Sequence, residues 1–185
     1  MTNYPIHTIN TAPDYAKQPI AVLEEAFGFI PAAAAAMANS APLINSFFSA
    51  FGHFRGDGTF SAAERQVLLL TNAVTNNCGW AVAFHTLEAL ADGVPAAEVD
   101  RIRRRGLPED PRFGALSALT RALIGQRGHL DQAQTADFLA AGFDRDQVLE
   151  VITGVAISTM SNHAATVADL PLEDQLRAHA WDASR

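Results

Sequence analysis

Apolar residues recur at helical spacing along most of the chain. After Ser61, for example, residues Val67, Leu68, Leu70 and Thr71 keep the i, i+3, i+4 spacing of one helix face. The sequence shows no alternation of apolar and polar residues with a period of two, the sign of a half-buried strand, and no fixed-length repeat. The pattern therefore predicts an all-helical fold.

Proline, glycine and capping residues divide this pattern into separate helices. Ser61 followed by Glu64 is a capping-box pattern, which predicts a helix start and gives Glu64 a structural role. Asn76 and Asn77 offer the next break and N-cap. The helices that we expect run over residues 20–27, 31–39, 42 to the break at 56–58, 61 to the break at 76–77, 78–91, 96–105, 111–126, 131–141 and 144–167.

The length and composition fit a single domain. The chain has 185 residues, of which 49% are apolar, enough to bury a substantial core. Three prolines without sustained periodicity make residues 1–19 an extended N-terminal arm. We expect the helical domain to span residues 20–170 and a C-terminal tail to follow over 171–185.

The charge and the cysteine count narrow the possible partners. Thirteen Lys and Arg against twenty Asp and Glu give a net charge of −7, which argues against nucleic acid and anionic lipid as partners. No apolar stretch approaches the roughly 18 residues that span a bilayer, and the N-terminus lacks the pattern of a secretory signal. A single cysteine forms no intrachain disulfide, which fits the reducing cytoplasm. We therefore expect a soluble cytoplasmic protein without membrane contacts.

The candidate chemistry lies where Cys78 precedes His85 by seven residues on one expected helix. At about 100° per residue, Cys78, Ala81 and His85 fall at roughly 0°, 300° and 340°, a single stripe that would line a pocket. A helix N-terminus stabilises a thiolate, and a histidine moves protons near neutral pH. About 10.5 Å of helix rise separates the pair, so a substrate, a water or a group on a crossing helix must connect them. The alternatives are a small buried cysteine and a satisfied core histidine.

This layout resembles the carboxymuconolactone decarboxylase family, which includes alkylhydroperoxidase D. Redox members of that family carry Glu, eleven residues, Cys-x-x-Cys, three residues and His. Cys78 and His85 match, whereas Ala81 replaces the second cysteine and Gln66 replaces the glutamate. The run from residue 41 resembles the lead-in helix of the family and residues 144–169 its closing helix, so the likeness covers roughly residues 31–169. It implies an alkylhydroperoxidase D-like helical array that assembles into homo-oligomers, trimers or hexamers, with active sites near subunit boundaries.

The resemblance and the residues together suggest an enzyme that acts on a small organic acid or related electrophile. Catalysis would use His85 for proton transfer together with Cys78, while Gln66 and Ala81 line the substrate site. Gln66 can orient a ligand but cannot exchange a proton. We expect no cofactor and no metal, because the six histidines are scattered and neither an HExxH motif nor a phosphate-binding glycine loop occurs.

Two other functions fit the same residues. One is a single-cysteine hydroperoxide reductase, an antioxidant enzyme that uses Cys78 and an external thiol as reductant. The other is a non-catalytic ligand-binding or scaffold protein that keeps the helical core.

Several further residues are expected to be structural. Trp80 falls at roughly 200° from Cys78 on the helix, which indicates core or interface packing. Asn162 and His163 lie on the closing helix, where packing or surface placement competes with an approach to the pocket. The basic cluster is interpreted as a solvated helix end and comprises Arg101, Arg103, Arg104 and Arg105.

Overall fold

The computed structural model describes residues 4–182, and all regular structure within them is helical. This confirms the predicted fold class. The elements in order are α1 (Asp14–Phe27), α2 (Ala32–Met37), α3 (Ala41–Gly56), α4 (Ala62–Thr75), α5 (Gly79–Ala91), α6 (Ala96–Arg103), α7 (Pro111–Gly125), α8 (Gln132–Ala140), α9 (Arg145–Val167) and the 3₁₀ helix η1 (Asp174–His179).

Most helix boundaries lie within a few residues of those predicted, but α1 begins at Asp14 and not at Ile20. Pro19 lies inside this helix, although we took it as the end of an extended arm. Its neighbours explain the difference, because Ala16, Pro19, Ile20 and Leu23 are all buried and follow helical spacing. Burial of this stripe stabilises the helix across a proline whose missing N–H removes one backbone hydrogen bond.

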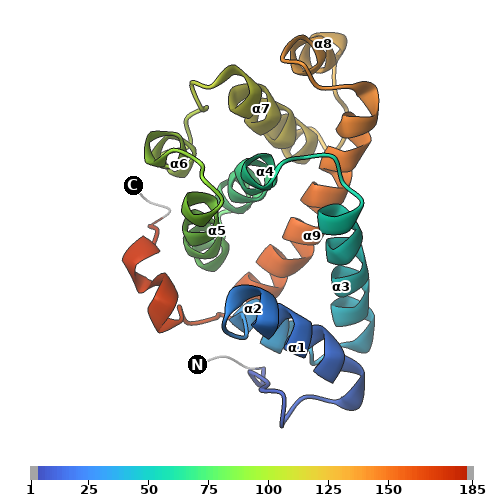
Figure 1. Ribbon diagram of the computed structural model, residues 1–185, viewed down its shortest axis with the longest axis vertical. Coiled ribbons are helices and arrows are strands. Elements are labelled where there is room, and N and C mark those ends of the chain that lie inside the picture. Colours follow the sequence, from blue (N-terminus) through green and yellow to red (C-terminus); the bar gives the residue numbers. More distant parts are fainter. Residues whose placement is uncertain (1–3, 183–185) are drawn as a thin grey trace.

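Helix α4 lies at the centre of the array. It packs against α5, α7 and α9, and Figure 1 shows α9 running diagonally behind it. Val67, Leu68 and Leu70 of α4 are fully buried. The crossing of α4 and α9 is close because Gly154 lacks a side chain: a Cβ there would lie 2.7 Å from Cδ2 of Leu68.

The predicted cap of α4 is confirmed. The backbone N–H of Glu64 donates to Oγ of Ser61 (3.2 Å), and the N–H of Ser61 donates to Oε2 of Glu64 (2.8 Å). Arg112 adds an ion pair of 2.8 Å to the other carboxylate oxygen. Burial raises the pKa of Glu64, but the hydrogen bonds from Ser61 and Arg112 outweigh this and lower it overall. Glu64 is thus a structural carboxylate.

The C-terminal tail packs back onto the helices. The carboxylate of Glu173 accepts a hydrogen bond from Nε1 of Trp80 on α5 (2.7 Å) and another from the backbone N–H of Ala32 on α2 (2.7 Å). Farther along, Nε1 of Trp181 donates to the carbonyl of Arg103. Figure 1 shows the tail, in red, crossing from α2 to the side of α5. The tail therefore joins two helices that are distant in sequence.

The interpretation of the basic cluster as a solvated helix end was wrong for Arg103, which is half-buried, whereas Arg101, Arg104 and Arg105 are exposed. Arg103 donates to the carbonyls of His179 and Ala180 in the tail. Burial lowers its pKa from the usual value. Arg105 donates to the side chain of Asn77 in the turn between α4 and α5 (2.8 Å). The sequence pattern missed these roles because the acceptors come from distant segments.

None of the helices within residues 4–182 combines the length and the apolar character that crossing a membrane requires.

Candidate functional site

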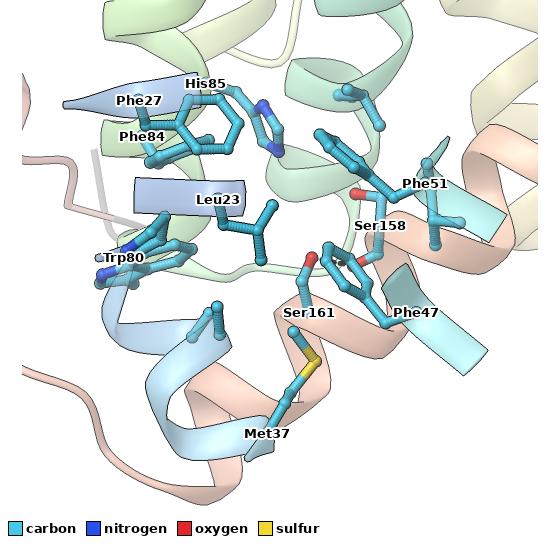
Figure 2. Close-up of a pocket in the computed structure, with 15 residues that line it drawn as sticks. Leu23, Phe27, Met37, Phe47, Phe51, Trp80, Phe84, His85, Ser158 and Ser161 are labelled. Atoms are coloured by element: carbon cyan, nitrogen blue, oxygen red, sulfur yellow. Dashed lines mark hydrogen bonds between the residues drawn. The ribbon is translucent and has the colours of Figure 1, made fainter. Parts of the chain in front are cut away.

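A small apolar cavity of about 50 Å³ lies where α1, α2 and α3 meet α4, α5 and α9 (Figure 2). Its wall is made mostly of aliphatic and aromatic side chains, with one imidazole and two hydroxyls. The lining residues are Leu23, Phe27, Pro31, Ala33, Ala34, Met37, Phe47, Phe51, Leu69, Trp80, Phe84, His85, Ile157, Ser158 and Ser161. A space of this size and polarity suits a small, largely apolar ligand.

Aromatic rings form one side of the wall. Phe84 stacks on Trp80 with ring centroids 5.2 Å apart and meets Phe27 edge-on at 5.1 Å. Phe47 and Phe51 of α3 stack at 5.6 Å. Such pairs stabilise the wall beyond the area they bury, so its shape is held by several helices at once.

His85 points into this cavity from α5, as Figure 2 shows. Its Nδ1 lies 3.2 Å from Oε1 of Gln66. An amide oxygen only accepts hydrogen bonds, so Nδ1 carries the proton and Nε2 keeps its lone pair. Within residues 4–182, Nε2 has no hydrogen-bond partner. The cavity therefore contains an unoccupied proton acceptor.

Gln66 is itself held in place by Asp92. Its Nε2 donates to Oδ2 of Asp92 (3.0 Å), which fixes which end of the amide faces His85. Sequence reasoning missed Asp92. It lies seven residues after His85, on the same stripe of α5, and caps the C-terminus of that helix, where the helix dipole disfavours an acid. An acid at this unfavourable end of the helix is the sequence signal that could have identified Asp92 as a functional residue.

Burial lowers the pKa of His85 to about 3. The residue is only 8% exposed, and desolvation disfavours the imidazolium form. His85 is therefore neutral across the physiological pH range, in the tautomer that Gln66 selects.

His85 also lines a second cavity, of about 20 Å³. The two cavities share His85 and the rings of Phe27 and Phe51, while Arg55 and Arg65 line only the smaller one. The guanidinium of Arg55 lies over both rings, 5.9 Å and 5.4 Å from their centroids. Positive charge thus lies beside an otherwise apolar site.

Cys78 and Ala81 do not line the cavity of His85, although we expected one shared stripe. Asn77 has a φ of 58°, which ends α4, and α5 begins only at Gly79. Cys78 is therefore the N-cap residue and lies outside the helical spacing that the expectation used. Its side chain is 3% exposed and makes no capping hydrogen bond. Ala81 is fully buried, and neither residue lines the smaller cavity.

Trp80 packs in the core, as the helical wheel indicated, but it also lines the cavity, which the wheel did not indicate. Asn162 is fully buried beside the cavity and donates to Oγ of Ser158 (3.3 Å). His163 is exposed.

In the part of the chain that the structure describes, no three His, Cys, Asp or Glu side chains are placed to hold a metal ion.

Sequence comparison finds a family model that matches the central part of the chain. The profile of the Carboxymuconolactone decarboxylase family matches residues 42–122, which contain Gln66, Cys78, His85 and Asp92. Over these residues the chain is similar to the carboxymuconolactone decarboxylase family, as the motif around Cys78 and His85 suggested. The match ends before α9, so the serines of the cavity lie outside the part that defines the family. No curated protein shows significant sequence similarity to the chain.

Several solved structures share the fold of this chain over nearly their whole length. An uncharacterised peroxidase-related protein from Ralstonia eutropha JMP134, described as an alkylhydroperoxidase AhpD core, has a TM-score of 0.83 at 18% identity, covering 95% of this chain and 94% of that one. A peroxidase-related protein from Silicibacter sp. TM1040 has a TM-score of 0.77 at 14% identity, covering 96% and 93%.

The debrominase Bmp8 is a third structure with this fold. A cysteine-to-alanine variant of it, in complex with 2,3,4-tribromopyrrole, has a TM-score of 0.78 at 15% identity and covers 95% of this chain and 94% of that one. At such identities the likeness establishes the fold and leaves the reaction to the site itself.

Proposed function

We propose that this protein is an enzyme of the carboxymuconolactone decarboxylase family that binds a small organic acid or related electrophile and transfers a proton at Nε2 of His85. One observation carries the proposal: Nε2 is an unpartnered acceptor in an apolar cavity, while Gln66 holds Nδ1–H. Geometry of this kind is what acid–base catalysis by histidine requires.

The neutral imidazole would act first as a base. When Nε2 takes a proton from the substrate, His85 becomes an imidazolium, and its Nδ1–H continues to donate to Gln66. The hydrogen bond between Gln66 and Asp92 would stabilise that charge by polarising the amide. Gln66 cannot accept a proton, so the proton stays on His85 until it returns to the product. One histidine thus serves as base and then as acid.

The surroundings support an acid with an apolar body. The hydrocarbon part fits the larger cavity, and Arg55 and Arg65 beside it supply the positive charge that a carboxylate needs. Apolar surroundings also favour loss of a carboxylate, because they remove its hydration. The complex of the debrominase with 2,3,4-tribromopyrrole supports a small, weakly polar ring as a ligand of this fold.

The position of Cys78 favours acid–base chemistry over peroxide reduction. The thiol is 3% exposed and does not line the cavity, so a peroxide bound next to His85 does not meet it. The catalytic role of Cys78 and the use of an external thiol stay predictions, as does the non-catalytic alternative.

We also propose that the protein is a cytoplasmic homo-oligomer, a trimer or a hexamer. Exposed apolar side chains on α9 support a contact between copies: Leu149 is 64% and Ile152 48% exposed. The molar mass measured by light scattering tests this, and a monomer at micromolar concentration contradicts it.

The catalytic proposal is tested with three proteins: wild type, His85→Phe and Cys78→Ala. Unsaturated lactone and β-keto acids are scored by release of CO₂ and by proton exchange in D₂O. Halogenated phenols and pyrroles, supplied with a thiol reductant, are scored by halide release. The third substrate class is tert-butyl hydroperoxide, also supplied with a thiol reductant.

We expect turnover of an acid by wild type and by Cys78→Ala, and its loss in His85→Phe. Phenylalanine keeps an aromatic ring on the wall while removing both nitrogens. Turnover that survives in His85→Phe refutes the proposal. Turnover of the peroxide that disappears only in Cys78→Ala establishes the reductase, and no turnover of any class favours the non-catalytic protein.

A further inference from the structure

Ser158 on α9 contributes a hydroxyl to the cavity of His85. Its side chain is buried, with 2% of the residue exposed, and its Oγ accepts a hydrogen bond from Nδ2 of Asn162 (3.3 Å). Figure 2 shows Ser158 and Ser161 on the side of the cavity away from His85. Gln66 and Asp92, which orient His85, lie on α4 and at the C-terminal end of α5, so the hydroxyl of Ser158 on α9 is independent of them.

The direction of the hydrogen bond to Ser158 is fixed by a chain of amides. Nδ2 of Asn72 donates to the carbonyl of Val155 (3.3 Å), so Oδ1 of Asn72 faces the other way. That oxygen accepts from Nδ2 of Asn76 (2.6 Å) and from Nδ2 of Asn162 (2.9 Å). Turning the Asn162 amide around would place two carbonyl oxygens against each other. Asn162 must therefore donate to Ser158.

The arrangement leaves one polar atom unsatisfied. Oδ1 of Asn162 is buried and has no hydrogen-bond partner. A buried orphan acceptor destabilises the folded state by roughly 1–3 kcal/mol. Orphans of this kind are rare in folded proteins and call for an explanation. Here the orphan oxygen results from using both N–H groups of Asn162 to orient its neighbours.

Because Ser158 accepts from Asn162, its own proton must go elsewhere. Three other buried hydroxyls donate to a backbone carbonyl, namely Thr86 to Val82, Thr120 to Leu116 and Ser161 to Ser158, and Thr71 donates to Oγ of Ser117. For the Ser158 hydroxyl, the described residues provide no acceptor. The proton is thus free to be donated to a molecule inside the cavity.

We propose that Ser158 is a specificity-determining hydrogen-bond donor, which binds a carbonyl-type acceptor oxygen of the substrate while Nε2 of His85 acts on its acidic proton. The inference rests on the proposed function, since it takes the same cavity as the substrate site. It narrows the substrate class to a small apolar molecule that carries an acceptor oxygen in addition to its acidic hydrogen.

The test compares two probes of the same shape, cyclopentanone and methylenecyclopentane. The ketone accepts a hydrogen bond and the alkene does not. Dissociation constants are measured by ¹H–¹⁵N NMR titration of wild type, Ser158→Ala and Ser161→Ala. Ser161 is the matched control, because it lines the same cavity but its hydroxyl already donates to a carbonyl.

We expect the preference for the ketone over the alkene to fall by roughly five-fold in Ser158→Ala and to stay unchanged in Ser161→Ala. An equal preference in wild type and Ser158→Ala overturns the inference, and so does the absence of ketone binding to wild type. If Ser158→Ala does not fold, Ser158→Cys keeps the size with a weak donor, and the same loss of preference is expected.

The probes separate this inference from the function itself. Neither probe donates a hydrogen bond through oxygen or nitrogen to His85, so their relative affinity reports on the donor at Ser158. If the ketone preference depends on Ser158 but His85→Phe retains turnover, the donor stands and the proton-transfer proposal fails. If turnover requires His85 but the preference for the ketone is the same in wild type and Ser158→Ala, only the proposal about Ser158 fails.

Discussion

Gln66 fixes His85 as a neutral proton acceptor. Oε1 of Gln66 lies 3.2 Å from Nδ1 of His85, and the other end of the amide donates to Asp92. In the redox motif that the chain resembles, an acid occupies the place of Gln66. In this chain an amide lies between the acid and the histidine, so the carboxylate of Asp92 orients His85 without exchanging protons with it.

Restoring an acid at position 66 should destabilise the protein unless Asp92 changes too. Gln66→Glu places a carboxylate oxygen about where Nε2 now lies, 3.0 Å from the carboxylate of Asp92. Two like charges at that distance repel. The additional change Asp92→Asn supplies an amide N–H that can donate a hydrogen bond to the new carboxylate at position 66. We expect a coupling free energy on the order of 1–3 kcal/mol between the two changes, measured by urea unfolding of both single variants and the double variant at pH 7.

The double variant should also raise the pKa of His85, since a carboxylate next to Nδ1–H stabilises the imidazolium. NMR titration of the imidazole measures this shift. Strictly additive stabilities would show that Gln66 and Asp92 do not form the pair that the structure describes.

The buried neutral state of His85 predicts how stability depends on pH. The pKa of His85 is about 3 in the folded protein and 6.5 in an ordinary environment. Between these values the unfolded chain binds a proton that the native state does not, so the free energy of unfolding falls as the pH falls. The loss between pH 7 and pH 4 is on the order of 3 kcal/mol.

Urea unfolding at a series of pH values checks this expectation. His85→Gln should lose this part of the slope, whereas His129→Gln, a change at an exposed position, should keep it. The same slope in His85→Gln and in wild type would mean that His85 is not held neutral by burial.

A side chain at Gly154 should destabilise the protein. A Cβ there would lie 2.7 Å and 2.9 Å from the two Cδ atoms of Leu68, in the core between α4 and α9. Overpacking of this kind destabilises by about 1–3 kcal/mol. Gly52 in α3 is the matched control, because a Cβ there meets nothing within 4 Å. Thermal unfolding should show Gly154→Ala destabilised and Gly52→Ala stabilised by about 0.5–1 kcal/mol; the opposite order would disprove the close crossing.

The bond between Glu173 and Trp80 should hold the tail against the wall of the cavity. Both carboxylate oxygens of Glu173 accept hydrogen bonds, one from Trp80 and one from the backbone of Ala32. Glutamine offers one acceptor oxygen, so Glu173→Gln leaves one donor unsatisfied and destabilises by about 1–3 kcal/mol.

Fluorescence reports this change directly. In a Trp181→Phe background, Glu173→Gln should shift the emission of Trp80 to longer wavelength as water reaches the indole. Asp174→Asn, on the same tail but with an 88% exposed side chain, should leave the spectrum unchanged. Identical spectra for all three proteins would show that the tail does not shield Trp80.

Local signals in the sequence determined the helices and the likeness to the family. The Ser61 capping box, the turn at Asn76 and Asn77 and the apolar spacing depend on residues within one or two turns of each other, so they are visible along the chain. The spacing of Cys78 and His85, together with the likeness to the family's motif, selected His85 and Gln66, which the structure brings into contact.

Only the tertiary structure decided what faces the cavity. A helical wheel assigned Cys78 and Ala81 to the stripe of His85, but the helix starts after Cys78, and Trp80 lines the cavity in their place. Asp92 acquires its role through its hydrogen bond with Gln66 on α4. Ser158 acquires its role through its hydrogen bond with the amide of Asn162. Spacing along one helix fixes an angle about its axis, whereas the partner that lies at that angle depends on how distant helices cross.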